Sequence, residues 1–183
     1  MFLGKTKQLA VLAVMAALST VLTVLGTVIS INTVFFTSAA AFLVGIAAVE
    51  IGFGAGSVFF LVCLFLDFLI NPNKLHGFLY LFLALYTLLS EAAYAALKRV
   101  KNRKRREGIC GGLRCLLFSL CYLPLALLFP RLLVPETLAA RSWYVPAMAV
   151  IGVLFWIFYD AAYIEVKKLV SRRLGRLFSE KSG

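Results

Sequence analysis

Seven of the nine residues at positions 98–106 are lysine or arginine, and this cluster stands between long apolar stretches. Loops rich in Lys and Arg remain on the inner side of a membrane, because these residues resist translocation. Apolar runs of this length are typical of helices that cross a bilayer. The cluster therefore fixes one point of the chain in the cytoplasm, and the neighbouring segments can be threaded outward from it.

The composition agrees with a membrane protein of one domain. The chain has 183 residues, of which 62% are hydrophobic and only 15% are charged, far from the balance of a soluble domain. Its net charge of +11 comes from residues at expected helix ends and in one short loop. No soluble module presents these charges to nucleic acid, so we interpret them as topology signals that also attract anionic lipid.

An α-helix needs about 20 apolar residues to cross roughly 30 Å of hydrocarbon. The run 34–70 is too long for one span, and Glu50 with the glycines at 52, 54 and 56 breaks it into a helical hairpin. The first apolar segment is too long for a signal peptide, so we expect it to be retained. We predict an all-α integral membrane protein, a compact bundle of six transmembrane helices at about 8–29, 34–50, 53–71, 77–97, 109–130 and 143–166.

The distribution of cations orients this bundle. With both termini in the cytoplasm, fifteen Lys and Arg residues fall on the inner side, in the N-terminal lead, the loop 98–108 and the tail 167–183. The outer side receives three, Lys74, Arg131 and Arg141. This asymmetry favours six spans, since a five-span arrangement would place one terminus outside and lose the agreement.

Small residues spaced four apart mark the faces on which membrane helices approach closely. The first span carries Ala13 and Ala17 at this spacing, with Ala10 on the same face. We expect this face to receive another membrane protein, with packing inside the bundle as the alternative. The spacing continues in the second span from Ala41 to Gly45.

Three ionisable residues fall inside spans four, five and six, at similar depth. Glu91, Arg114 and Asp160 each lie five or six residues from the inner end of their span, or about 8–9 Å at 1.5 Å per residue. Ionisable groups at membrane depth are costly and usually have partners or a function. We predict a buried ionic cluster that holds the three spans together, with a proton or ion relay as the alternative.

Polar residues gather in the three outer connections. Convergent polar groups beside aromatic side chains are typical of a small-molecule pocket, whereas single members of such a set are also ordinary turn or interfacial residues. The candidate substrate-binding residues are Asn32, Thr33, Asp67, Asn71, Asn73, Lys74, His76, Arg141, Trp143 and Tyr144.

No sequence feature indicates an enzyme, a metal site or a bound cofactor. The four cysteines form no Cys-x-x-Cys pair, and one histidine cannot complete a usual zinc set. Motifs for nucleophilic hydrolases, zinc proteases and phosphate loops are absent from the sequence. Active transport would therefore need ATPase subunits from other chains.

The pattern resembles the substrate-binding S components of energy-coupling-factor (ECF) transporters. Three features carry the likeness: the short basic lead into an alanine-rich span at 6–19, the sequence 42–46 followed by glycines through Gly56, and the Asn-Pro-Asn turn at 71–73. The likeness covers most of the chain, although each motif has low specificity.

The resemblance implies a multi-pass protein of the bacterial cytoplasmic membrane that captures a vitamin or similar small molecule at its outer face. Its partners would be a transmembrane T component, docked on Ala13 and Ala17, and two cytoplasmic ATPases. The sequence does not name the substrate, although the basic outer residues favour an anionic one. The alternative is a scaffold similar to the rod-shape-determining membrane proteins, which carry no substrate.

Overall fold

The computed structural model describes residues 5–29, 33–71, 74–97, 103–128 and 144–179. Within these ranges the chain is entirely helical and has no strand. Six helices follow one another: α1 (Lys5–Val28), α2 (Thr33–Glu50), α3 (Phe53–Ile70), α4 (Lys74–Ala96), α5 (Arg103–Leu128) and α7 (Tyr144–Ser179). The predicted all-α class is therefore confirmed for the described part of the chain.

Four of these helices, α1 to α4, are long and apolar enough to cross a membrane. A shorter apolar segment, Gly108–Tyr122, lies within α5. Large apolar side chains face outward on several helices, among them Val14, Phe65 and Phe158, each exposed by two thirds or more. Such an apolar surface suits lipid and would be unfavourable in water. The chain is accordingly a helical membrane protein in its coarse architecture.

Helix α2 occupies the centre of the fold. It packs most extensively against α4 and α1, and it also contacts α3 and α7. Four of its five alanines are buried, and Ala40, Ala41 and Val44 have no exposed surface. An apolar helix suits a central position in a bundle, and small side chains let the neighbouring backbones approach closely.

The connection between α2 and α3 is a tight turn at Gly52. This glycine has a φ of 132°, which a residue with a side chain would rarely adopt. The turn brings α3 back against α2, and a Cβ atom at Gly56 would lie 2.6 Å from the Cα of Ala48. The expected hairpin break is therefore at Gly52, and Gly56 provides the close approach of the two helices.

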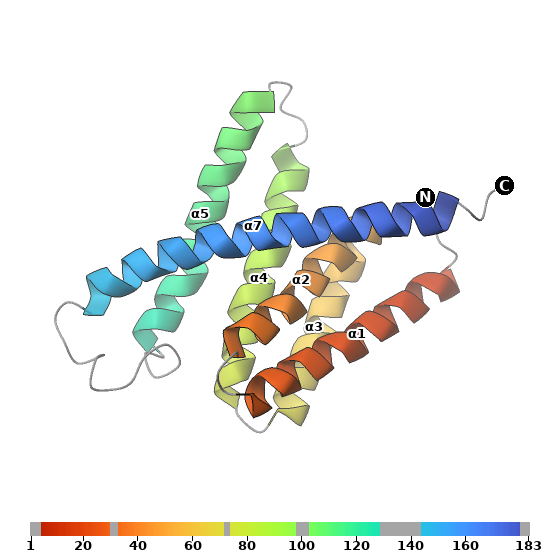
Figure 1. Ribbon diagram of the computed structural model, residues 1–183, viewed down its shortest axis with the longest axis horizontal. Coiled ribbons are helices and arrows are strands. Elements are labelled where there is room, and N and C mark those ends of the chain that lie inside the picture. Colours follow the sequence, from red (N-terminus) through yellow and green to blue (C-terminus); the bar gives the residue numbers. More distant parts are fainter. Residues whose placement is uncertain (1–4, 30–32, 72–73, 98–102, 129–143, 180–183) are drawn as a thin grey trace.

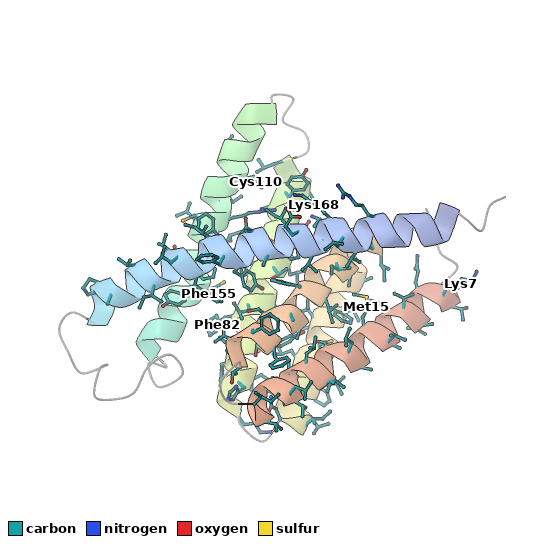
Figure 2. The ribbon with its side chains drawn as sticks, in the orientation of Figure 1. Lys7, Met15, Phe82, Cys110, Phe155 and Lys168 are labelled. Carbon is teal, nitrogen blue, oxygen red and sulfur yellow. The ribbon has the colours of Figure 1, made fainter. Side chains whose placement is uncertain are left out.

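Figure 1 shows how the remaining helices lie around α2. α7 crosses the other helices along the long axis of the molecule, and α5 contacts only α4 and α7 among its closer neighbours. The start of α1, marked by Lys7 in Figure 2, and the end of α7 lie at the same end of the long axis.

Two helices extend beyond the expected boundaries. α5 begins at Arg103, inside the expected loop 98–108, and α7 continues through the expected tail to Ser179. Arg and Lys are good helix formers, and no glycine or proline interrupts residues 103–107. The 36 residues of α7 make a helix about 54 Å long at 1.5 Å per residue, longer than one membrane crossing requires.

Substitution of Gly56 by Ala is expected to destabilise the protein by about 1–3 kcal/mol, since the added Cβ would overlap the α2 backbone. Thermal unfolding in detergent measures this loss. The matched control is Gly54→Ala, two residues away in the same helix, where an added Cβ meets nothing within 4 Å. The control should keep or raise the unfolding midpoint; equal midpoints for the two variants would contradict the close packing.

Candidate functional site

Polar side chains run along the contact between α1 and α3 in two matching rows. On each helix they recur every fourth residue, so that they share one face. Thr27 at one end of the rows bonds Asn71, and Ser19 at the other end lies next to Cys63. We call this set the polar seam; it comprises Ser19, Thr23, Thr27, Cys63, Asp67 and Asn71.

Asn71 closes the seam at the end of α3. Its side-chain amide donates to Asp67 Oδ1 at 3.2 Å, and its Oδ1 accepts from the Thr27 hydroxyl at 2.5 Å. Its backbone N–H donates to the Asp67 carbonyl at 2.9 Å and so caps the helix. Asn71 is therefore only 1% exposed, although it follows the last residue of α3.

Lys74 also binds the C-terminal end of α3. Its ammonium donates to the backbone carbonyl of Phe68, and it donates to the carbonyl of Asn71 at 3.0 Å. Cations are favourable at these unpaired C-terminal carbonyls. Lys74 therefore acts as a cap, and no ion pair links it to Asp67 within the described chain.

Two other predicted residues adjoin the same end of the bundle. The Thr33 hydroxyl donates to the Gly26 carbonyl at 2.7 Å and ties the start of α2 to α1. His76 is partly buried in the first turns of α4, where the charge of Asp67 reaches its ring. The ends of α1 and α3 and the beginnings of α2 and α4 thus converge (Figure 1).

Five of the ten candidate substrate-binding residues therefore lie together: Thr33, Asp67, Asn71, Lys74 and His76. Asn32, Asn73, Arg141 and Trp143 lie outside the described residues. Tyr144 is the first residue of α7, and its side chain is likewise outside the described part.

The three alanines of the expected docking face are exposed. Ala10, Ala13 and Ala17 lie on α1, and no other helix of the described chain covers them. Large apolar residues beside them, Leu9 and Val14, are 69% and 70% exposed. This side of α1 is therefore available to lipid or to another membrane protein.

The predicted ionic cluster is divided into two pairs. Arg114 binds both carboxylate oxygens of Asp160, at 3.1 and 3.3 Å, and so joins α5 to α7. Glu91 instead binds Lys167, whose ammonium lies 2.7 and 2.8 Å from its two oxygens. The expected single triad of Glu91, Arg114 and Asp160 is thus corrected: Arg114 bridges only one of the two acids.

The physical reason is the length of α7. Because the helix continues without a break past 166, Lys167 lies two turns beyond Asp160 on a similar face and reaches Glu91 on α4. Lys167 is the first residue of the expected basic tail 167–183. A signal was present, since residues 160, 163 and 167 have helical spacing on one face.

Tyrosine hydroxyls complete both ion pairs. Tyr163 donates to Glu91 Oε1 at 2.9 Å, and Tyr86 donates to Asp160 Oδ1 at 3.2 Å. Trp156 in turn donates to the Tyr86 hydroxyl at 2.9 Å. Sequence reasoning missed these residues because their types are also common in apolar cores. We call these two ion pairs with their tyrosines the ion-pair clamp, which joins α4, α5 and α7; it comprises Tyr86, Glu91, Arg114, Asp160, Tyr163 and Lys167.

A cavity of about 300 Å³ opens beside the Glu91–Lys167 pair. Ala48, Val49, Phe53, Tyr94 and Ala95 complete its wall. It lies near the α2–α3 turn, at the opposite end of α4 from Lys74 and His76. The clamp is therefore in contact with an open space, whereas the polar seam is enclosed by the helices.

Comparison of the chain with models of known families, with curated proteins and with solved structures finds no match in any of the three.

Replacement of Arg114 by Leu is expected to destabilise the protein by about 3–5 kcal/mol, because it leaves the Asp160 carboxylate without its cation. The double variant Arg114→Leu with Asp160→Asn should recover a large part of this loss, since no unpaired charge remains. Unfolding midpoints in detergent measure both. A single variant as stable as the parent, or a double variant no better than the single, would contradict the clamp.

Proposed function

We propose that the chain is the membrane-embedded substrate-binding subunit of an ECF-type importer in the bacterial cytoplasmic membrane. It captures a vitamin or similar small molecule at the outer face. It delivers that substrate inward together with a transmembrane T component and two cytoplasmic ATPases. The chain crosses the membrane six times, with α5 and α7 as the fifth and sixth crossings and both termini in the cytoplasm.

The observation that carries this proposal is the convergence of polar residues from separate connections at one end of the bundle. The Thr27–Asn71 and Thr33–Gly26 hydrogen bonds hold α1, α2 and α3 together there. His76 joins them from α4. Polar groups with fixed positions at the mouth of an apolar bundle are what recognition of a small polar molecule requires.

The surface of α1 supports the proposed docking of a transmembrane T component. A substrate-binding subunit without a phosphate loop needs a face on which an energised partner can dock. The exposed alanines of α1 allow the backbone of another helix to approach closely. The start of α1 and the end of α7 lie at one end of the molecule, in agreement with both termini on one side (Figure 1).

The purified protein is expected to release one small molecule in about stoichiometric amount when it is denatured and analysed by mass spectrometry. Asn71→Leu should lose this molecule, because it removes the link between Thr27 and Asp67. Ser57→Ala is the control, since its hydroxyl lies at the other end of α3. A non-transporting scaffold would release no stoichiometric molecule, and that result would exclude the importer.

The double variant Ala13→Trp with Ala17→Trp is expected to abolish uptake into cells while it retains the co-purifying molecule. The bulky rings would hold the partner helix away from α1. The control is Val58→Trp with Leu61→Trp, at positions 62% and 60% exposed on α3, which should leave uptake unchanged. Uptake that survives the α1 variant would remove the docking proposal, and loss with both variants would attribute the effect to insertion or folding.

A further inference from the structure

The cavity of about 300 Å³ beside the Glu91–Lys167 pair lies at the opposite end of α4 from the candidate substrate-binding residues. Its volume is at the lower end of the range of small-molecule sites, about 300–1,000 Å³. Its wall combines one carboxylate and one ammonium group with two aromatic rings and small apolar side chains. The cavity can therefore hold a group that is itself partly charged and partly apolar.

The Lys167 ammonium is held in place at this wall. It donates to the two carboxylate oxygens of Glu91 at 2.7 and 2.8 Å, and it lies 5.4 Å from the ring centroid of Tyr94 and 5.9 Å from that of Tyr163. An ammonium group has three N–H donors. The two bonds to Glu91 leave one donor for a further acceptor, and the Lys167 side chain is 24% exposed, so a ligand can reach it.

The Glu91 carboxylate has a vacant acceptor position of its own. Among the described residues, its Oε1 accepts from Tyr163 and Lys167, whereas its Oε2 accepts from Lys167 alone. A carboxylate oxygen accepts about two hydrogen bonds, so Oε2 retains room for one donor. The ion pair therefore offers one charged donor and one charged acceptor side by side.

The Glu91–Lys167 pair has no net charge, and this decides the class of ligand. A ligand with only an anionic group would meet the Glu91 carboxylate, and one with only a cationic group would meet the Lys167 ammonium. A zwitterion places an opposite charge against each of them. Its cation must be a primary ammonium, because Oε2 needs an N–H donor and a quaternary ammonium has none.

The location of the cavity indicates a lipid headgroup as the source of this zwitterion. Val49 and Phe53 belong to the wall and are 40% and 49% exposed, on an outer surface that is largely apolar. On α7, Phe158 is 74% exposed, whereas the exposed side chain next to Lys167 is the cation Lys168, labelled in Figure 2. A change from apolar to basic residues along a membrane helix is typical of the level of the lipid headgroups.

We propose that the cavity binds the headgroup of a zwitterionic phospholipid with a primary ammonium, phosphatidylethanolamine. Its phosphate accepts the remaining N–H of Lys167, and its ammonium donates to Oε2 of Glu91. Its acyl chains lie outside the cavity, along the exposed side chains of Val49 and Phe53. This inference rests on the architecture of a helical membrane protein and does not depend on the importer proposal.

The test is the binding of short-chain lipids to the delipidated protein in detergent, measured by native mass spectrometry. Phosphatidylethanolamine is expected to bind about tenfold more tightly than phosphatidylcholine or phosphatidylglycerol of equal chain length, since each of these lacks the charged donor to Glu91. Glycerophosphoethanolamine, which has the same headgroup without acyl chains, should bind more weakly than the lipid because it buries no hydrocarbon.

Two variants with matched controls locate the binding site. Ala95→Trp should abolish the lipid preference, because the ring fills the cavity from an exposed position of its wall and leaves both charged residues in place. Its control is Ala96→Trp, at the next exposed position of α4. Lys167→Gln should weaken the binding of phosphatidylethanolamine about tenfold. Its control is Lys168→Gln, which removes only an exposed ion pair with Glu165 and should retain the parent affinity.

Three results would overturn the proposal. The first is equal affinity for the three lipids. The second is a lipid preference that survives both Ala95→Trp and Lys167→Gln, or that is lost equally in their matched controls. The third is a soluble headgroup that binds as tightly as the lipid, which would assign the cavity to a soluble zwitterion. If Lys167→Gln does not fold, Ala95→Trp still decides the outcome. None of these measurements concerns uptake, so the importer proposal is tested separately.

Discussion

The hydrocarbon core of a bilayer offers no water, so each polar group at that depth needs a partner within the protein. The hydroxyls of Thr37, Ser38 and Thr87 meet this constraint by donating to carbonyls of their own helix. Glu91 and Asp160 meet it in ion pairs, and tyrosine hydroxyls complete these pairs. This requirement places polar residues in the interior and leaves the outer surface to apolar side chains.

The constraint produces two kinds of helix contact. α1, α2, α3 and α4 meet at small residues, as at Gly56 against Ala48 and at Gly45 against Thr87. α5 and the middle of α7 are joined to each other and to α4 by ion pairs and tyrosines. Close backbone packing depends on shape alone, whereas an ion pair needs both of its charges. The two halves of the molecule are therefore sensitive to different substitutions.

The sequence predicts the helices better than it predicts the contacts between them. Apolar length and the glycines at 52 and 56 locate α2 and α3, because these signals are local. The division of the triad depends on how far α7 continues, and basic residues after 166 are equally typical of a tail and of a helix. The matching rows at 19, 23, 27 and 63, 67, 71 are visible in the sequence. Their partnership requires that α1 and α3 run side by side in the same direction, which is a property of the fold.

The polar seam and the ion-pair clamp differ in the partners that they give to their carboxyl groups. Glu91 and Asp160 each have a cation within 3.1 Å and a tyrosine hydroxyl besides. Asp67 is more deeply buried than Asp160, yet the nearby Lys74 donates to backbone carbonyls and forms no ion pair with it. The partner that the described chain gives Asp67 is the Asn71 amide, so a neutral hydrogen-bond donor serves this carboxyl group whereas cations serve Glu91 and Asp160.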